Sequence, residues 1–341
     1  MAPGQVKWGV LGAASIAVQR MMPAIGEAQS ATLHALASRD EAKARAVAAK
    51  FGAPRAYAGY ERLLADPEID AVYIPLPNQL HFEWSLRALE AGKHVLCEKP
   101  LCLASRDVED LCIARDRAGK HIEEAFGYRN HAQWGKVLEL IAAGAIGPVR
   151  AAHAVLAKQF LDPADVRNNP AAGGGALYDL GSYAINALNL VYGRQPLRVS
   201  ALAEQDPRFG IDRLTSALLD YGDAHASLTV ASQAGPSAWA THQQLTVLGA
   251  RGWLRMNFPF AQARPIACFI EVGHEQSVGG VPTIVHEFPP ANQYALQVER
   301  FSRRVLGATV PAWPIEDALA TLRTIEATFA AARDRTWKEV A

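Results

Sequence analysis

The sequence has few cysteines and no excess of either charge. Only four of its 341 residues are cysteine, and no two form a Cys-x-x-Cys pair, which argues against a disulfide-rich scaffold and favours a reducing, cytoplasmic location. Lysine plus arginine and aspartate plus glutamate number 34 each, so nucleic acid is not expected as a partner. The ten histidines form no His-Glu-x-x-His spacing, and we expect no metal.

Long apolar runs are also missing. No stretch reaches the roughly 18 apolar residues of a membrane-spanning helix, so no membrane association is expected. The N-terminus, MAPGQVKWGV, has no basic region followed by a long apolar one, as an export signal would. The length exceeds a usual single core, which predicts two domains.

Short apolar strands alternate with helical segments in the first part of the chain. Because parallel strands need such crossovers, residues 1–125 are expected to form a doubly wound parallel sheet, the dinucleotide-binding domain. Ligands bind at the carboxyl ends of the strands in such sheets, so the residues that follow each strand are the candidates for function. The expected strands cover residues 6–11, 32–37, 71–74, 95–97 and 121–125, and the expected helices run to residue 28 and cover 41–51, 60–66, 82–91 and 106–118.

The turn after the first strand has the context of a dinucleotide fingerprint. Gly12 is present, but Ala14 and Ala17 take the places of the second and third glycines, so the motif is degenerate. We expect the pyrophosphate to lie near Gly12, Ala14, Ser15 and Ile16. An ordinary tight turn between strand and helix is the alternative.

The next two strand ends are candidates for binding the rest of the cofactor. Ser38 and Arg39 suit the 2′-phosphate of NADP, while Asp40 keeps NAD possible; alternatively, Arg39 is only a surface residue. The third loop is stiffened by two prolines and can hold a cofactor ring, although its histidine could instead cap the following helix. The candidates in this loop are Leu76, Pro77, Asn78 and His81.

The strand at 95–97 ends abruptly in Glu98-Lys99-Pro100. The proline ends the strand and confines Lys99 to an extended or turn conformation, which would direct Lys99 into the ligand crevice. A solvated strand exit is the alternative.

After residue 125 most segments are predicted to be strands. Their partial alternation predicts an α+β domain at 126–341, with an antiparallel sheet that is covered by helices on one face and free to meet a partner on the other. The expected strands are 149–160, 197–202, 214–221, 225–233, 243–248 and 253–257, with helices at 133–143 and 314–333.

One segment of this second half combines glycines with polar residues. Gly173 to Gly175 would let the backbone approach a ligand, and a helix to about residue 191 would put Asp179 and Tyr183 on one face. A tyrosine is a poor base near neutral pH unless a cation such as Lys99 lowers the pKa of its hydroxyl. A buried structural helix is the alternative.

Together these motifs resemble the Gfo/Idh/MocA family of NAD(P)-dependent oxidoreductases. The resemblance rests on the Gly12 turn, Pro77-Asn78, His81, Glu98-Lys99-Pro100, Tyr128-Arg129 and the glycine-rich run to Tyr183. It implies a Rossmann domain, then an open-faced sheet domain that joins subunits as a homodimer or homotetramer. It also implies Lys99, Asp179 and Tyr183 as the catalytic group. With a tyrosine at position 183, the chain resembles the branch of the family that contains aldose dehydrogenases, glucose–fructose oxidoreductase and dimeric dihydrodiol dehydrogenase.

We therefore predict reversible hydride transfer between NADP and a hydroxyl-bearing carbon of a sugar or cyclic polyol, as in an aldose 1-dehydrogenase. One alternative is a trans-1,2-dihydrodiol dehydrogenase, with Phe160, Trp134 and Trp239 as an apolar wall; another is an NADP(H)-binding sensor without turnover. Glu98, Lys99 and Arg129 complete the expected cofactor site. The expected substrate contacts are Arg167, Asn168, Asp179 and Tyr183.

Overall fold

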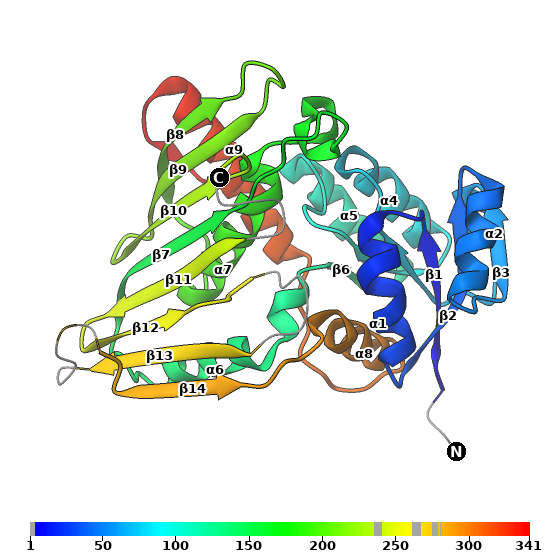
Figure 1. Ribbon diagram of the computed structural model, residues 1–341, viewed down its shortest axis with the longest axis horizontal. Helices are drawn as coiled ribbons and strands as arrows, with labels where there is room; N and C mark the ends of the chain where they lie inside the picture. The colour runs from blue at the N-terminus through cyan, green and yellow to red at the C-terminus, as the bar shows by residue number, and fades with distance from the viewer. Residues whose placement is uncertain (1–3, 235–240, 261–266, 275–278, 280) are drawn as a thin grey trace. The chain divides into compact units, whose positions relative to one another are not determined.

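The computed structural model of the protein describes residues 4–234, 241–260, 267–274, 279 and 281–341 (Figure 1). The chain forms two compact units. The first contains Met1–Cys102, Arg106–Asn130 and Asn292–Ala318, and the second contains Leu103–Ser105, His131–Ala291 and Leu319–Ala341. The sequence predicts one boundary, after residue 125, whereas residues 292–318 pack with the first unit. In the part of the chain that the structure describes, no helix combines the length and apolar character needed to cross a membrane.

The first unit contains a six-stranded parallel sheet in the order β3-β2-β1-β4-β5-β6, which confirms the predicted doubly wound fold. The order reverses between β1 and β4, where such sheets bind ligands. In this unit only β3 is missing from the expected strands; it is 4 residues long, and all of its side chains are only half-buried. The strands are β1 (Val6–Leu11), β2 (Ala31–Ser38), β3 (Arg55–Ala58), β4 (Ala71–Ile74), β5 (His94–Cys97) and β6 (Ile122–Glu124).

Helices cover this sheet, and one of them comes from late in the chain (Figure 1). In the late helix, α8 (Gln293–Val305), the Phe301 ring packs 5.4 Å from the Trp8 ring of β1, and the Trp8 indole donates a hydrogen bond to Ser302 Oγ at 3.0 Å. Thus α8 completes the core of the first unit. The other helices are α1 (Met22–Glu27), α2 (Glu41–Lys50), α3 (Tyr60–Leu64), α4 (His81–Glu90) and α5 (Ser105–Ala118).

The second unit contains a nine-stranded sheet, in the order β14-β13-β12-β11-β7-β10-β9-β8-β15. Only the β7–β10 pair is parallel among the described pairings, so the expected mostly antiparallel sheet is confirmed. The strands are β7 (Val149–Ala157), β8 (Arg198–Gln205), β9 (Asp212–Asp220), β10 (His225–Ala231), β11 (His242–Gly249), β12 (Gly252–Met256), β13 (Cys268–His274), β14 (Ile284–Phe288) and β15 (Lys338–Glu339).

The two faces of this sheet differ in their cover. Helices α6 (Ala132–Ala142) and α7 (Ser182–Tyr192) pack on one face (Figure 1). The alternate residues of β8 and β9 point the other way, and there Leu202 is 74% and Leu218 is 52% exposed. The face of the larger sheet that carries these two leucines is therefore exposed in this chain. The last helix, α9 (Glu316–Asp334), leads to the C-terminal strand.

Candidate functional site

The turn after β1 can take a dinucleotide. Gly12 has a φ of +110°, and a Cβ at this position would lie 3.1 Å from Leu76 Cδ2 of the loop after β4. A glycine is therefore required both by the backbone and by the neighbouring loop. A helix begins at Ser15, so its first N–H groups lie at the carboxyl edge of the sheet, as anion binding requires. The predicted residues Gly12, Ala14, Ser15 and Ile16 thus fit a pyrophosphate.

The residues after β2 distinguish the two nicotinamide cofactors. The Asp40 carboxylate accepts a hydrogen bond from Lys43 N–H at 3.1 Å and so caps α2, while Ser38 Oγ accepts one from Asp40 N–H at 3.2 Å. Arg39 is exposed. Because capping already engages Asp40, the group at this strand end that is available for a ribose substituent is a guanidinium, which suits a phosphate better than a hydroxyl.

His81 supports the loop after β4. It is fully buried, with Nε2 2.7 Å from Leu76 O and Nδ1 2.8 Å from Pro100 O. Burial lowers the pKa of its imidazole. Since both ring nitrogens face backbone carbonyls, the prediction that His81 contacts the cofactor is corrected: it joins two loops of the edge, and Leu76, Pro77 and Asn78 remain the candidates.

Buried partners hold both sides of the Glu98-Lys99-Pro100 turn. Tyr73, on the neighbouring strand β4, donates from Oη to Glu98 Oε1 at 2.5 Å. Burial raises the pKa of Tyr73 well above its usual value, so its hydroxyl stays a donor. Beyond the cis Lys99–Pro100 peptide, Leu101 N–H donates to Glu124 Oε1 at 2.9 Å. Lys99 itself is half-buried.

Arg129 belongs to the interior of the first unit. It is 4% exposed, its Nη1 lies 3.1 Å from Asp317 Oδ2, and its guanidinium lies over the rings of Phe126 and Trp313. A cofactor contact is predicted for Arg129 from the family resemblance, which includes the Tyr128-Arg129 pair. The structure corrects this prediction, because the burial and the aromatic stacking fix the guanidinium inside the unit.

The three glycines of the second unit serve the packing of the chain against itself. A Cβ at Gly173 would lie 2.3 Å from Leu103 Cδ2, one at Gly174 would lie 2.4 Å from the Arg167 carbonyl oxygen, and one at Gly175 would lie 2.1 Å from Asp212 Oδ1. The expectation that they let the backbone approach a ligand is therefore corrected. The same Asp212 accepts Leu177 N–H at 2.8 Å, and burial raises the pKa of this carboxyl to about 6.

Asp179 and Tyr183 follow these glycines, but not on one continuous α-helix. Residues Leu177–Gly181 form a π-helical turn, and α7 begins at Ser182. The Asp179 carboxylate is held by Arg167, whose Nε lies 3.0 Å from Oδ2, and the Arg167 guanidinium stacks 4.6 Å from the Phe160 ring centre. Tyr183 is half-buried beside Phe260, with 6.2 Å between ring centres. Arg167 and Asp179 thus form an ion pair in the second unit, and Tyr183 lies in the first turn of α7, which follows Asp179 in the chain.

Other predicted substrate contacts have structural roles. Asn168 is 5% exposed, and its Nδ2 donates to the carbonyls of Phe160 and Asp162 at 3.2 and 2.8 Å, so it shapes the loop and is no longer assigned to the substrate. Trp134 is 1% exposed and donates to Pro259 O at 2.6 Å. Trp239 lies outside the described residues. The proposed apolar wall for a diol thus loses Trp134 to the core.

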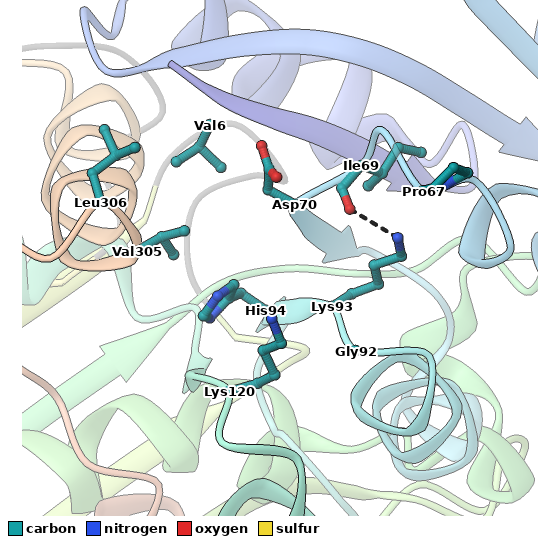
Figure 2. Close-up of a pocket in the computed structure, with 10 residues that line it drawn as sticks. All are labelled: Val6, Pro67, Ile69, Asp70, Gly92, Lys93, His94, Lys120, Val305 and Leu306. Carbon is teal, nitrogen blue, oxygen red and sulfur yellow. Dashed lines mark hydrogen bonds between the residues drawn. The ribbon is translucent and has the colours of Figure 1, made fainter. Parts of the chain in front are cut away.

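A separate cavity of about 360 Å³ lies at the amino edge of the parallel sheet (Figure 2). It is bordered by Val6, Asp70, Lys93 and His94, at or beside the starts of β1, β4 and β5. Lys93 Nζ donates to Ile69 O at 2.9 Å and to Asp66 O at 2.6 Å, which fixes its ammonium against the loop before β4. None of the predicted site residues lines this cavity.

Sequence reasoning missed three supporting residues: Tyr73, Glu124 and Asp212. The first two had a signal, because each is a polar residue at or near the end of a buried strand. Asp212 had none, since its partner Leu177 lies 35 residues earlier in the chain.

Comparison with known proteins supports the same interpretation. Residues 6–126 match the profile of an oxidoreductase family with an NAD-binding Rossmann fold, and residues 134–255 match that of a GFO/IDH/MocA C-terminal domain. The chain is 41% identical to an uncharacterized oxidoreductase, ORF334, of Rhizobium meliloti, over 98% of this chain and 99% of the relative. It is 35% identical to a D-xylose 1-dehydrogenase (NADP(+)) of Haloferax volcanii, over 95% and 97%.

A solved structure agrees over nearly the whole length. KijD10, a 3-ketoreductase from Actinomadura kijaniata solved with NADP and TDP-benzene, has a TM-score of 0.85 and 30% identity, covering 96% of this chain and 98% of its own. The Rossmann turn, the Glu-Lys-Pro strand end, the glycine-rich segment and these matches lead to one conclusion: the chain belongs to the Gfo/Idh/MocA family of NAD(P)-dependent oxidoreductases.

Proposed function

We propose that this enzyme is an NADP-dependent aldose 1-dehydrogenase, in which Tyr183 exchanges the proton of the substrate hydroxyl. The observation that carries the proposal is the anchoring of the Lys99 turn, with Tyr73 on Glu98 on one side and Glu124 on the Leu101 N–H on the other. A catalytic lysine needs such fixed surroundings, because misplacement of a reacting group slows the chemistry steeply.

Each of the three proposed catalytic residues, Lys99, Asp179 and Tyr183, has a distinct task. A nicotinamide cofactor, held through the Gly12 turn and the loop after β4, would supply the acceptor for the hydride that leaves C1 of the sugar. Tyr183 takes the proton of the C1 hydroxyl as general base, and the Lys99 ammonium lowers the pKa of the Tyr183 phenol and stabilises the developing alkoxide. Asp179 orients the sugar hydroxyls, since Arg167 holds its carboxylate in place.

The preference for NADP over NAD rests on the end of β2. Arg39 is exposed and Asp40 is engaged as the cap of α2, an arrangement that favours a 2′-phosphate over a free 2′-hydroxyl. The xylose dehydrogenase relative is named as NADP-dependent, and KijD10 was solved with NADP, which supports the same preference.

The proposal includes a homo-oligomer, formed by the open face of the large sheet. Exposed leucines at positions 202 and 218 lie on this face, where a folded chain usually has polar residues. Light scattering of the purified protein should give a dimer or tetramer mass, and Leu218→Glu should lower it; a monomeric wild type would contradict this part.

A substrate panel tests the function. The protein is incubated with NADP⁺ and a series of aldoses and trans-dihydrodiols, and with NADPH and a keto-sugar nucleotide, while reduced-cofactor absorbance is followed. We expect turnover with an aldose, and Tyr183→Phe should lower kcat at least ~100-fold while NADPH affinity, measured by fluorescence, stays the same.

Other results would change the assignment. Turnover with the diols alone, or with the keto-sugar nucleotide alone, would assign the enzyme to that substrate class instead of to the aldoses. If no substrate of the panel is turned over but NADPH binds tightly, the results would favour an NADP(H)-binding sensor without turnover. Wild-type turnover in Tyr183→Phe would remove Tyr183 from the mechanism.

A further inference from the structure

A buried acid lies beneath the proposed catalytic turn and is not used in the mechanism above. We propose that Glu124 is a positioning residue, whose carboxylate form holds the turn from Lys99 to Leu101 in its working geometry and whose protonation loosens that turn. This inference rests on the proposed function, because it concerns the lysine assigned to the reaction.

The geometry places Glu124 where it can act on Lys99. Glu124 ends β6 and pairs in register with Cys97, the last residue of β5. Its Oε1 accepts the N–H of Leu101 at 2.9 Å, two residues after Lys99 and directly beyond the cis Lys99–Pro100 peptide. A carboxylate binds a backbone N–H more strongly than a neutral acid does, so the charge state of Glu124 sets the strength of this anchor.

The second oxygen of Glu124 is unusual. Glu124 is 6% exposed, and among the described residues no hydrogen-bond partner reaches its Oε2. A buried carboxylate with one oxygen unpaired is costly, whereas a protonated carboxyl loses less on burial. The site therefore accepts both charge states, which an acid fully paired with cations would not do.

Both cationic and anionic side chains face Glu124 from several elements. Arg129, from the segment after β6, and Lys99, after β5, favour its ionised form, as the Leu101 N–H does, while Asp317, in the first turn of α9, disfavours it. Tyr128, Cys97 and Cys102 also lie within its field. Burial outweighs the cations and raises the pKa of Glu124 to about 7, so both forms are populated at neutral pH.

The test uses Glu124→Gln, which keeps the shape and the acceptor for Leu101 but cannot ionise. Wild-type kcat should fall up to about tenfold from pH 8 to pH 6, as the carboxylate form is lost. Glu124→Gln should lack the part of this fall that has its midpoint near pH 7 and keep only the part that the Tyr183 base contributes, and its kcat at pH 8 should be up to about tenfold below that of the wild type. Glu299→Gln is the matched control, because Glu299 accepts the Ser30 N–H at 2.8 Å in the same unit but away from the turn; it should keep the wild-type profile.

Two readouts need no substrate. The infrared carbonyl absorbance of protonated carboxyls should have a component that titrates near pH 7 in the wild type and is missing from Glu124→Gln, whereas the component of Asp212, near pH 6, should remain in both. The Leu101 amide resonance should shift with the same midpoint. A wild-type kcat profile in Glu124→Gln, or a Leu101 resonance that does not titrate, would overturn the inference while leaving the proposed function intact. Failure of every substrate in the panel would instead refute the proposed function, whatever the two spectra show.

Discussion

The two units hold their site-bearing segments by different means. In the first unit, buried polar side chains anchor the loops: His81 joins two loops, Tyr73 donates to Glu98, and Glu124 accepts from Leu101. In the second unit, close backbone packing at three successive glycines does this work, with Asp212 as the main polar anchor. The loops of the first unit therefore depend mainly on buried polar side chains, and the glycine segment of the second unit depends mainly on close backbone packing.

This difference shows where each half is vulnerable. The neighbour of Glu124, Glu123, is fully buried and forms ion pairs with Arg300 and Arg304 of α8. The carboxyl edge of the first unit thus depends on a helix that is about 180 residues away in the chain. The glycine segment of the second unit depends on residues nearer in the sequence, from Leu103 to Asp212.

The largest effect is expected from Glu123→Gln. It leaves two arginines without their shared partner, and breaking a buried ion pair in this way costs about 3–5 kcal/mol of unfolding free energy. Denaturant unfolding measures it. Glu41→Gln, which removes an exposed pair with Arg45 on α2, should cost at most about 0.5 kcal/mol and serves as the control. Equal losses for the two variants would contradict the role assigned to α8.

Gly175→Ala should come next and should affect the second unit. Its Cβ would collide with Asp212 Oδ1, at a φ of +114° that non-glycine residues rarely adopt, and would displace the acceptor of the Leu177 N–H. We expect a loss of about 2–4 kcal/mol by denaturant unfolding, since strain and a lost buried hydrogen bond add. Gly26→Ala, in α1 with nothing within 4 Å, should instead stabilise the protein by about 0.5 kcal/mol. A neutral Gly175→Ala would show that the loop can relax.

The same contrast explains which parts could be predicted from the sequence. The β-strand and α-helix alternation of the first unit was predicted from apolar runs, because buried parallel strands carry that signal strongly. Candidate site residues such as Gly12 and Lys99 could be identified from the sequence because they lie directly after predicted strands. The helix α8 was not predicted, although Asn292 as its cap and apolar residues at 294, 298, 301 and 305 form a helical pattern.

The supporting residues were harder to find because their partners are distant in the chain. The sequence indicates that Asp179 is an acid near Tyr183, but not that Arg167 holds it. It identifies Arg129 as a candidate cofactor contact, but does not show that Asp317 and two aromatic rings keep the Arg129 side chain buried. Local spacing identifies chemical types, whereas long-range packing decides whether a side chain meets a ligand or another part of the protein.

Arg39→Ala tests the cofactor end of the first unit. Loss of a charge-assisted contact to the 2′-phosphate should weaken NADPH binding about tenfold, with NADH binding nearly unchanged, as measured by fluorescence titration. Asp40→Ala is the matched control: it removes the cap of α2 and about 1 kcal/mol of stability, but should leave the NADPH to NADH affinity ratio as it is. A ratio that changes in Asp40→Ala and not in Arg39→Ala would reverse the assignment.

The smallest effect at neutral pH is expected at the opposite edge of the same sheet, where His94 lines the cavity of Figure 2. Burial, with His121, Lys120 and Arg304 nearby, lowers the pKa of His94 to about 4 from its usual 6.5, and its Nδ1 accepts the His121 N–H at 3.0 Å. The folded state therefore binds fewer protons than the unfolded state between these values, so this contribution to stability is present above pH 6.5 and is lost as the pH falls to 4.

Glu124, at the carboxyl edge, has the opposite sign, because its raised pKa favours the protonated folded state below pH 7. The two edges are therefore compared through the difference in unfolding free energy between variant and wild type, measured as a function of pH. In His94→Asn the side-chain oxygen can accept the His121 N–H without titrating, so its unfolding free energy should match the wild type near pH 7.5 and exceed it increasingly towards pH 5. Denaturant unfolding at several pH values measures this. A constant difference across that range would mean that the pKa of His94 is the same in the folded and unfolded states, and that His94 contributes nothing to the pH dependence of stability.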